Sequence, residues 1–164
     1  MAKGFASNCM RWLSGCFVLT RSLLRILYSS KTHDRLPEND LTKLLSQSRK
    51  NNQLVNVNGI LCYSHTDFIQ VLEGPENVVL SLYQKILTDE RHHECKLLNI
   101  CLSNKYIFNN WSMGYIDISP GDMQTLRQEL PEKLSNDNAD KFAYQLKTYL
   151  NKQSRKKPEN IIFI

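Results

Sequence analysis

Tyr28, Gln70 and the pair Asn51-Asn52 are the polar residues with the most usable chemistry in this sequence. A tyrosine is a natural redox partner, because loss of its electron is coupled to loss of its phenolic proton. A glutamine amide carries both donors and an acceptor, so it can change what it offers to two neighbours. Moving one buried hydrogen bond changes a free energy by about 0.5–1.5 kcal/mol, which is enough to bias an element with two conformations. These residue types therefore indicate electron, proton and hydrogen-bond chemistry.

The segment around Gln70 predicts a buried position for its amide. Side chains alternate between the two faces of a strand, so Gln70 faces away from its neighbours Ile69 and Val71. Phe68 and Leu72 share its face, and that face is therefore predicted to be buried. A buried amide needs hydrogen-bond partners, so we expect other polar groups next to Gln70.

The motifs of common enzyme classes are missing from the sequence. Its six glycines form neither a G-x-G-x-x-G nor a Walker pattern, and no catalytic triad has a recognisable spacing. Carboxylates such as Glu73 and Asp89 fall at turns and helix ends, which favours helix-terminal charge and solvated surface. His92, His93 and Cys95 lie close together, but no second cluster completes a closed zinc site. We therefore expect no metal.

Hydrophobic periodicity divides the central part of the chain into strands and helices. A mostly apolar run at 23–28 is typical of a central strand, and Asn39 or Asp40 can cap the helix that follows. Ser64-His65-Thr66-Asp67 is turn chemistry inside a hairpin, and Gly74-Pro75 ends its second strand and opens another helix. The predicted core elements are strands 23–28, 59–63, 68–72, 96–102 and 111–118 and helices 41–51 and 76–88.

The order of these elements, β-α-β-β-α-β-β, is a ferredoxin-like split with one added strand, so the predicted fold class is α+β. We expect its two helices on one face of the sheet. Two further helices, at about 121–130 and 138–151, are expected to pack on the other face. The predicted organisation is an N-terminal extension of unknown role at 1–20, a core domain at 21–119, a C-terminal helical pair at 120–152 and a tail at 153–164.

Composition and charge are those of a globular domain without a nucleic-acid groove. Of 164 residues, 41% are hydrophobic and 23% are charged. The net charge is +5, but residues 21–120 carry eleven cations and ten acids, so no nucleic-acid partner is expected. The longest apolar run before residue 21 is Cys16–Leu19, far short of the roughly 20 residues that span a bilayer, so no membrane span is expected. Five cysteines without paired spacing favour reduced thiols in a cytoplasmic protein.

Several short segments, weak alone, form a specific set when they are taken in order. They are Tyr28-Ser29-Ser30, Asn51-Asn52, Phe68-Ile69-Gln70-Val71-Leu72-Glu73-Gly74, Asp89-Glu90-Arg91-His92 and Trp111-Ser112-Met113. This set resembles the BLUF family, the blue-light sensors that use a flavin. The resemblance runs from about Leu23 to Ile118, and the family has the order of elements predicted above. The two later helices resemble those of short BLUF proteins, in which sensor and output surface share one chain.

The resemblance implies a role for each matching residue. Tyr28 matches the tyrosine that gives an electron and a proton to the excited flavin, and Gln70 matches the glutamine that bridges this tyrosine and the flavin N5/O4 edge. Asn52 matches the asparagine that hydrogen-bonds the polar edge of the isoalloxazine ring, with Asn51 as its neighbour at the cofactor. The strand of Trp111 and Met113 matches the one whose side chains exchange position near the glutamine; these four residues, Tyr28, Gln70, Trp111 and Met113, form the expected photochemical set.

Other residues match the pocket walls and the phosphate end of the cofactor. The apolar positions that line the ring are matched by Leu44, Phe68 and Ile86. Lys85 falls where relatives carry a cation near the flavin phosphate, and Arg91 and His92 are expected at the same end. Lys85 replaces an arginine of some relatives and lacks its bidentate fork. The resemblance implies FAD as the cofactor, and the looser phosphate contact of a lysine leaves FMN as the alternative.

The resemblance implies a blue-light photoreceptor that is not an enzyme and that binds FAD without a covalent bond. The implied partner is a protein, such as a response regulator or transcription regulator, or a second copy in a homo-oligomer. Two other function classes stay open at the level of the sequence. A flavin-free module for RNA or protein would use Phe68 and Tyr63 as exposed aromatic residues. A small flavin-binding enzyme would need a catalytic cation or base beside the flavin, and none is convincing.

Overall fold

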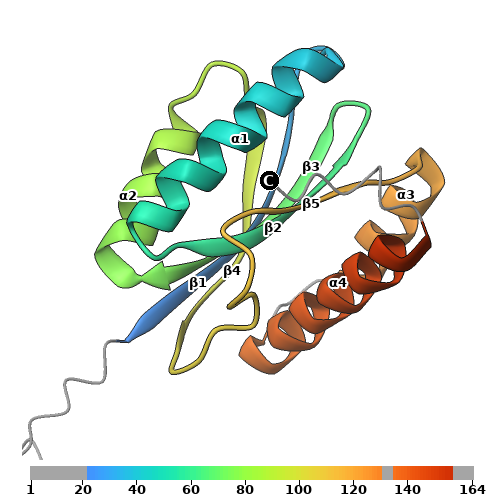
Figure 1. Cartoon of the computed structure of the whole chain (residues 1–164). Coiled ribbons are helices and arrows are strands. Elements are labelled where there is room, and N and C mark those ends of the chain that lie inside the picture. The colour runs from blue at the N-terminus through green and yellow to red at the C-terminus, as the bar shows by residue number, and fades with distance from the viewer. Residues whose placement is uncertain (1–21, 131–134, 157–164) are drawn as a thin grey trace, which may run out of the picture.

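The computed structural model describes residues 22–130 and 135–156 of the chain, which form a mixed sheet with helices on both faces (Figure 1). The strand order is β4-β1-β3-β2-β5, with β2 and β5 parallel and the other pairs antiparallel. The strands are β1 (Leu23–Lys31), β2 (Asn58–Ser64), β3 (Asp67–Pro75), β4 (His93–Ser103) and β5 (Gly114–Asp117). The helices are α1 (Glu38–Leu54), α2 (Glu76–Leu87), α3 (Pro120–Glu129) and α4 (Asn136–Lys156). The predicted fold class and element order are confirmed.

Alternation along the central strands builds two cores, one on each face of the sheet. Tyr28 and Leu72 belong to the core under α1 and α2, whereas their neighbours Leu27 and Val71 belong to the core that contains Phe142 of α4. Figure 1 shows the same division, with α1 and α2 on one face and α3 and α4 on the other. The predicted placement of the two helix pairs is therefore confirmed.

The first helix begins earlier and ends later than predicted. Pro37 is its N-cap residue, and the Pro37 carbonyl accepts from the amides of Asp40 and Leu41 at 3.0 Å each. Asn39 and Asp40 lie inside the first turn, so the predicted cap was wrong. The helix continues to Leu54, and both asparagines of the Asn51-Asn52 pair are helical.

The fifth strand starts later than predicted. β5 comprises Gly114–Asp117, and the segment Trp111-Ser112-Met113 precedes it. Side chains of α1 bind two carbonyls of that segment: Asn52 Nδ2 donates to Ser112 O at 2.8 Å, and Arg49 Nε donates to Met113 O at 3.0 Å. The Trp111 carbonyl already accepts from the amide of Gly59 in β2 at 3.1 Å, but regular pairing with β2 begins only at Gly114, because the next two carbonyls are taken by α1.

Glu73 was predicted on solvated surface but is buried, with 1% of its surface exposed. Its carboxylate accepts from Arg25 Nε at 3.0 Å and from the backbone amides of Ile107 and Phe108. Arg25 is also buried and reaches Asp140 of α4. The sheet, the loop before β5 and α4 are therefore tied together by one ionic network.

The two C-terminal helices follow Ser119, whose hydroxyl caps α3 by accepting from the amide of Asp122 at 3.1 Å. α4 continues to Lys156, beyond the end predicted for the helical pair at residue 152. The predicted N-terminal extension at 1–20 and residues 157–164 of the predicted tail lie outside the described residues. No helix in the described ranges has the length and apolar character needed to cross a membrane.

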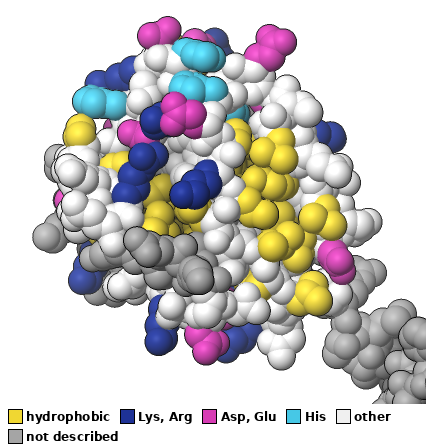
Figure 2. Space-filling model, turned by 180° about the vertical axis from the view of Figure 1, so that it is seen from behind, with side chains coloured by type: hydrophobic (Ala, Val, Ile, Leu, Met, Phe, Trp, Pro, Cys, Tyr) yellow, Lys and Arg dark blue, Asp and Glu magenta, His cyan; other side chains and the backbone are white. Residues whose placement is uncertain are grey.

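Strand β4 forms an edge of the sheet and carries exposed apolar side chains. α2 packs over β1 and β3, which leaves part of this outer strand uncovered. Figure 2 shows the molecule from behind relative to Figure 1, and hydrophobic side chains are grouped on this face. The large exposed apolar residues of β4 and α2 are Leu97, Ile100, Leu102, Leu80 and Leu87.

Candidate functional site

A pocket of about 210 Å³ lies between α1, α2 and the sheet, and we call it the α1–α2 pocket. Its walls are mainly apolar, with amides on the sheet side and charged residues at one end. Its lining residues are Tyr28, Thr32, Leu36, Leu44, Leu45, Ser48, Asn52, Leu61, Phe68, Gln70, Leu72, Leu82, Lys85, Ile86, Asp89, Arg91, His92 and Met113. Most of the residues predicted for a cofactor site are therefore brought together here.

A hydrogen-bonded series of three side chains lies on the sheet side of this pocket. The Tyr28 hydroxyl donates to Gln70 Oε1, and Gln70 Nε2 donates to Met113 Sδ at 3.4 Å. All three residues are buried. The expectation of buried partners for the Gln70 amide is therefore confirmed, and both ends of the amide are occupied.

Burial also sets the protonation of Tyr28. Desolvation is the main cause that raises the pKa of this hydroxyl far above its ordinary value, and the neighbouring Cys95 and Tyr83 add to the effect. The Tyr28 and Tyr83 ring centroids are 5.2 Å apart. Tyr28 is therefore a neutral hydrogen-bond donor at physiological pH.

The two asparagines of α1 have different surroundings. Asn52 is buried, lines the α1–α2 pocket and holds Ser112 O. Asn51 is exposed, and its Oδ1 accepts from Gln47 Nε2 at 2.9 Å. Successive residues of a helix point about 100° apart, so the helical path through both residues turns Asn51 away. The structure does not bring Asn51 to the pocket.

The charged end of the pocket is formed by α2 and the turn that follows it. Lys85, Asp89, Arg91 and His92 line it together. Hydrogen bonds from Arg91 lower the pKa of Asp89 to about 2, so this pair is ionised. Burial is the main cause that lowers the pKa of His92, whose Nδ1 lies 3.1 Å from Ser30 Oγ. With Lys85 and Arg91 against Asp89, this end has a net positive charge.

Trp111 does not line the α1–α2 pocket. Its ring lies 6.2 Å from the Phe108 ring, centroid to centroid, and Lys147 Nζ of α4 lies 5.6 Å from its centroid. It packs against the core on the α4 side of the sheet. Of the two residues predicted to exchange near Gln70, Met113 is the one beside the amide in this structure.

Some lining residues were absent from the predicted site. Leu45 and Ser48 are two of them, and they precede the predicted Asn52 at helical spacing of three and four residues, which was enough to indicate a shared face. Arg49, which does not line the pocket but holds the Met113 carbonyl, had no such signal, because that carbonyl is distant in sequence. Within the described ranges, no three His, Cys, Asp or Glu side chains are grouped to hold a metal ion.

The aromatic residues that an RNA-binding module would expose are buried. Tyr63 and Phe68 are each 2% exposed, and their rings stack with centroids 4.8 Å apart. The Tyr63 hydroxyl accepts from the amide of Leu36 at 2.9 Å. These two rings offer no stacking platform for bases, so the RNA alternative is not favoured.

A family model described as BLUF, sensors of blue light using FAD, matches residues 23–114. This range covers more than half of the chain and includes the strands and both helices around the α1–α2 pocket. The chain belongs to the BLUF family. The family resemblance of the ordered segments is therefore confirmed.

Curated relatives share the BLUF region. The blue light- and temperature-regulated antirepressor BluF of Escherichia coli is 34% identical over 71 residues, which are 43% of this chain and 18% of the relative. The photoactivated adenylate cyclase subunit alpha of Euglena gracilis is 28% identical over 108 residues, 66% of this chain and 10% of the relative. The chain thus spans less than a fifth of the length of these relatives.

Solved BLUF structures have the same fold. A structure described as the BlsA photo-activated state has a TM-score of 0.61 and 30% identity, covering 76% of this chain and 94% of that one. The dark-state structure of the BLUF protein BlrB has a TM-score of 0.55 and 27% identity, covering 68% of this chain and 83% of that one. The BLUF fold therefore extends over most of the described residues.

Proposed function

We propose that this BLUF protein is a blue-light photoreceptor that binds FAD without a covalent bond in the α1–α2 pocket. The observation that carries the proposal is the buried series Tyr28–Gln70–Met113 along one side of that pocket. The matching family model describes sensors, and we assign the chain a sensory role without catalytic activity of its own.

The residues of the pocket fit a flavin. Aliphatic side chains of α1 and α2 suit the apolar faces of a planar ring, and the Gln70 and Asn52 amides suit its polar edge. The pocket end with Lys85, Arg91 and His92 owes its positive charge to Lys85 and Arg91 and suits the phosphates of a dinucleotide, which supports FAD over riboflavin. When bound, the flavin supplies absorption of blue light and acceptance of an electron.

The side chains of this protein supply the hydrogen-bond change. The Tyr28 hydroxyl donates a hydrogen bond to Gln70 Oε1, and Gln70 Nε2 donates one to Met113 Sδ. We propose that light reverses which end of the Gln70 amide faces these neighbours. The amide has donors at one end and an acceptor at the other, so reversal changes both bonds together.

We propose that the change in the Gln70 hydrogen bonds is transmitted from the pocket to α4 through β5. Met113 is followed by Gly114, the first residue of β5, and Gly114 lies against Leu150 of α4: a Cβ added to this glycine would come 2.9 Å from Leu150 Cδ2. A shift of the segment at Met113 would therefore press on α4. The proposed reader is a protein partner, such as a response or transcription regulator, or a second copy of the chain. Antirepressor and cyclase relatives support regulation of other proteins or domains.

The absorption spectrum of the purified full chain, in darkness and just after blue illumination, tests the proposal. We expect flavin bands that move slightly to the red and recover in darkness. Gln70→Leu should keep the flavin and lose the shift, whereas Gln124→Leu, the same change at an exposed residue of α3, should keep both. A colourless protein that FAD cannot reconstitute would contradict flavin binding, and an unchanged light response in Gln70→Leu would contradict the hydrogen-bond mechanism.

A second measurement identifies the cofactor. Flavin released by heat from the purified protein should co-migrate with FAD in chromatography. FMN as the released species would show that Lys85 and its neighbours grip one phosphate rather than a dinucleotide.

A further inference from the structure

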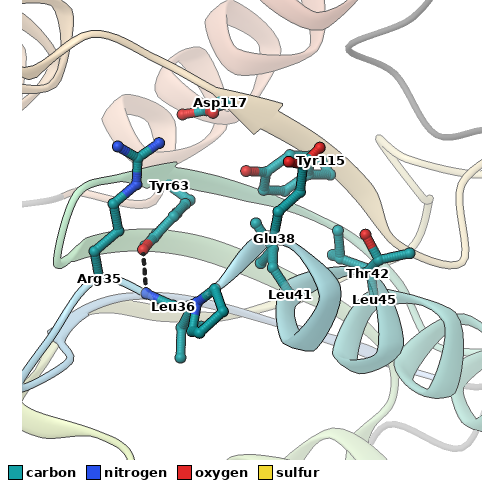
Figure 3. A pocket seen from close by; sticks show the side chains of 10 residues that line it. Arg35, Leu36, Glu38, Leu41, Thr42, Leu45, Tyr63, Tyr115 and Asp117 are labelled. Atoms are coloured by element: carbon teal, nitrogen blue, oxygen red, sulfur yellow. Dashed lines mark hydrogen bonds between the residues drawn. The ribbon is translucent and has the colours of Figure 1, made fainter.

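A second pocket, of about 470 Å³, lies on the opposite side of α1 from α2 (Figure 3). We call it the α1–β5 pocket. It is bounded by the loop before α1, the first half of α1, and the strands β2 and β5. Its lining residues are Arg35, Leu36, Pro37, Glu38, Leu41, Thr42, Leu45, Tyr63, Tyr115 and Asp117. Its volume lies within the range of about 300–1,000 Å³ typical of sites for small molecules.

The α1–β5 pocket contains a buried hydroxyl without a partner. Tyr115 is 6% exposed, and its Oη is closed to solvent and has no hydrogen bond among the described residues. Figure 3 shows this hydroxyl pointing into the pocket, toward the side lined by Tyr63 and Arg35. Tyr63 differs, because its hydroxyl is satisfied by the amide of Leu36. Buried polar groups nearly always have partners, so the free Tyr115 hydroxyl indicates a missing acceptor.

The hydroxyl of Tyr115 is a donor. Burial is the main cause that raises its pKa above the ordinary value, and the Asp117 carboxylate raises it further. The group therefore keeps its proton at neutral pH. A ligand that satisfies it must present a hydrogen-bond acceptor, such as a hydroxyl or carbonyl oxygen.

The mouth of the pocket carries more negative than positive charge. Glu38 and Asp117 are exposed carboxylates, and Arg35 is the single cation among the lining residues. No ion pair joins any of these three to another group in the part of the chain that the structure describes. Figure 3 shows the Glu38 side chain extending from the start of α1 at the pocket. Two unpaired carboxylates against one guanidinium favour a ligand with a positive group.

The inner wall is apolar and aromatic. Leu41 and Leu45 are buried on α1, and the rings of Tyr63 and Tyr115 form the facing wall. Such walls favour an apolar or aromatic ligand body and, near two rings, a cation.

We propose that the α1–β5 pocket binds a small amphipathic ammonium compound. Its apolar body would lie against Leu41 and Leu45, an acceptor at its inner end would satisfy the Tyr115 hydroxyl, and its ammonium group would meet Glu38 and Asp117. Glu38 has no partner within the described ranges and can move aside to admit the ligand. The site shares Leu36 and Leu45 with the α1–α2 pocket but needs no light or flavin to bind.

Calorimetric titration of the purified full chain in darkness tests this site with three probes. Tyramine has an aromatic body, a phenol oxygen and an ammonium group. Phenethylamine lacks the phenol oxygen, and 4-hydroxyphenylacetate replaces the ammonium group with a carboxylate. We expect tyramine to bind with a dissociation constant of about 1 mM or below. Phenethylamine should bind at least about threefold more weakly, and 4-hydroxyphenylacetate at least about tenfold more weakly.

Two variants and one control assign the binding to these residues. Tyr115→Phe should remove the preference for tyramine over phenethylamine, and Glu38→Gln should weaken both amines about threefold or more. Glu76→Gln, the same change in the first turn of α2, should leave all three affinities unchanged. If Tyr115→Phe fails to fold, the affinity of Glu38→Gln for the two amines still tests the proposal. No saturable tyramine binding up to roughly 10 mM, equal binding of tyramine and 4-hydroxyphenylacetate, or unchanged affinity in Glu38→Gln would overturn the proposal.

Discussion

The hydroxyl of Tyr28 donates to the amide oxygen of Gln70, which is its direct partner across β1 and β3. Directly opposite residues of an antiparallel pair have their side chains on the same face and in contact. The geometry of this hydrogen bond is therefore fixed by strand register rather than by a loop. Met113, the other partner of Gln70, lies outside the strands. The Gln70 amide thus links Tyr28, which is fixed by strand pairing, to Met113, which lies on a segment outside the strands.

Tyr28→Phe should abolish the light-induced red shift, because the variant has no hydroxyl to donate to Gln70. We expect at least a tenfold loss of its amplitude with the flavin still bound. The variant leaves Gln70 Oε1 without its donor, at a cost of about 1–3 kcal/mol in the free energy of unfolding. Difference spectra after blue illumination measure the first effect and urea denaturation the second. Tyr144→Phe, at an exposed tyrosine of α4, is the control, and a full shift in Tyr28→Phe would contradict the role of the hydroxyl.

Met113→Leu should alter the recovery of the light response and leave its existence intact. Leucine has nearly the volume of methionine, so we expect a stability change below about 1.5 kcal/mol. The variant loses the sulfur that accepts from Gln70 Nε2, a weak hydrogen bond of about 0.5–1 kcal/mol. Because this contact stabilises the amide orientation seen here, recovery in darkness should slow about two- to fivefold. Met123→Leu, at a buried methionine of α3, should recover at the wild-type rate.

Strand periodicity accounts for the part of the site that could be predicted from the residues alone, and the resemblance to the BLUF family accounts for the rest. The alternation of Phe68, Gln70 and Leu72 fixed one buried face of β3, because the period of a strand is two and admits no other arrangement. That prediction needed only local pattern. Tyr28 lies on the same face because β1 pairs with β3, which a local pattern does not report.

Contacts between segments that are distant in sequence account for the features that were predicted wrongly or not at all. The start of β5 was misplaced because Asn52 and Arg49 of α1 take the carbonyls of Ser112 and Met113, and no local pattern reports such bonds. Glu73 looked like a solvated carboxylate because its partner Arg25 lies 48 residues away in sequence. The α1–β5 pocket was not predicted for the same reason, since its walls come from three separate segments.

His92 should make the folded protein lose stability as the pH falls. Burial lowers the pKa of His92 below its ordinary value of 6.5, although the Asp89 carboxylate acts in the other direction. The unfolded chain therefore takes up a proton at this residue at a higher pH than the folded protein does. The stabilising contribution is complete above pH 6.5 and is lost as the pH falls through the folded pKa.

Urea denaturation at several pH values between about 7.5 and 5 measures this effect. We expect the free energy of unfolding of the wild type to fall more steeply than that of His92→Gln over this interval. His65→Gln, at an exposed histidine of the β2–β3 turn, should retain the wild-type slope. Equal slopes for wild type and His92→Gln would show that His92 is not the group responsible.

Arg25→Met should cost about 3–5 kcal/mol in the free energy of unfolding, because it leaves the Glu73 carboxylate buried without its cation. Arg25 and Glu73 are 2% and 1% exposed, and their Nε and Oε2 atoms are 3.0 Å apart. Lys43→Met is the matched control, since Lys43 pairs with Asp40 at an exposed position of α1 and should contribute less than about 1 kcal/mol. Urea denaturation of both variants at constant flavin concentration gives the comparison.

The effect of Asp140→Asn separates the two halves of this network. The Asp140 side chain is 41% exposed, so its ion pair with Arg25 is screened by water and should contribute about 1 kcal/mol or less. Arg25 keeps Glu73, Ser103 Oγ and the Lys105 carbonyl as partners in that variant. A loss in Asp140→Asn as large as that in Arg25→Met would mean that attachment of α4, rather than compensation of Glu73, dominates the network. A small loss would place the stabilisation within the sheet and leave the packing of buried residues such as Phe142 and Leu146 as the main attachment of α4.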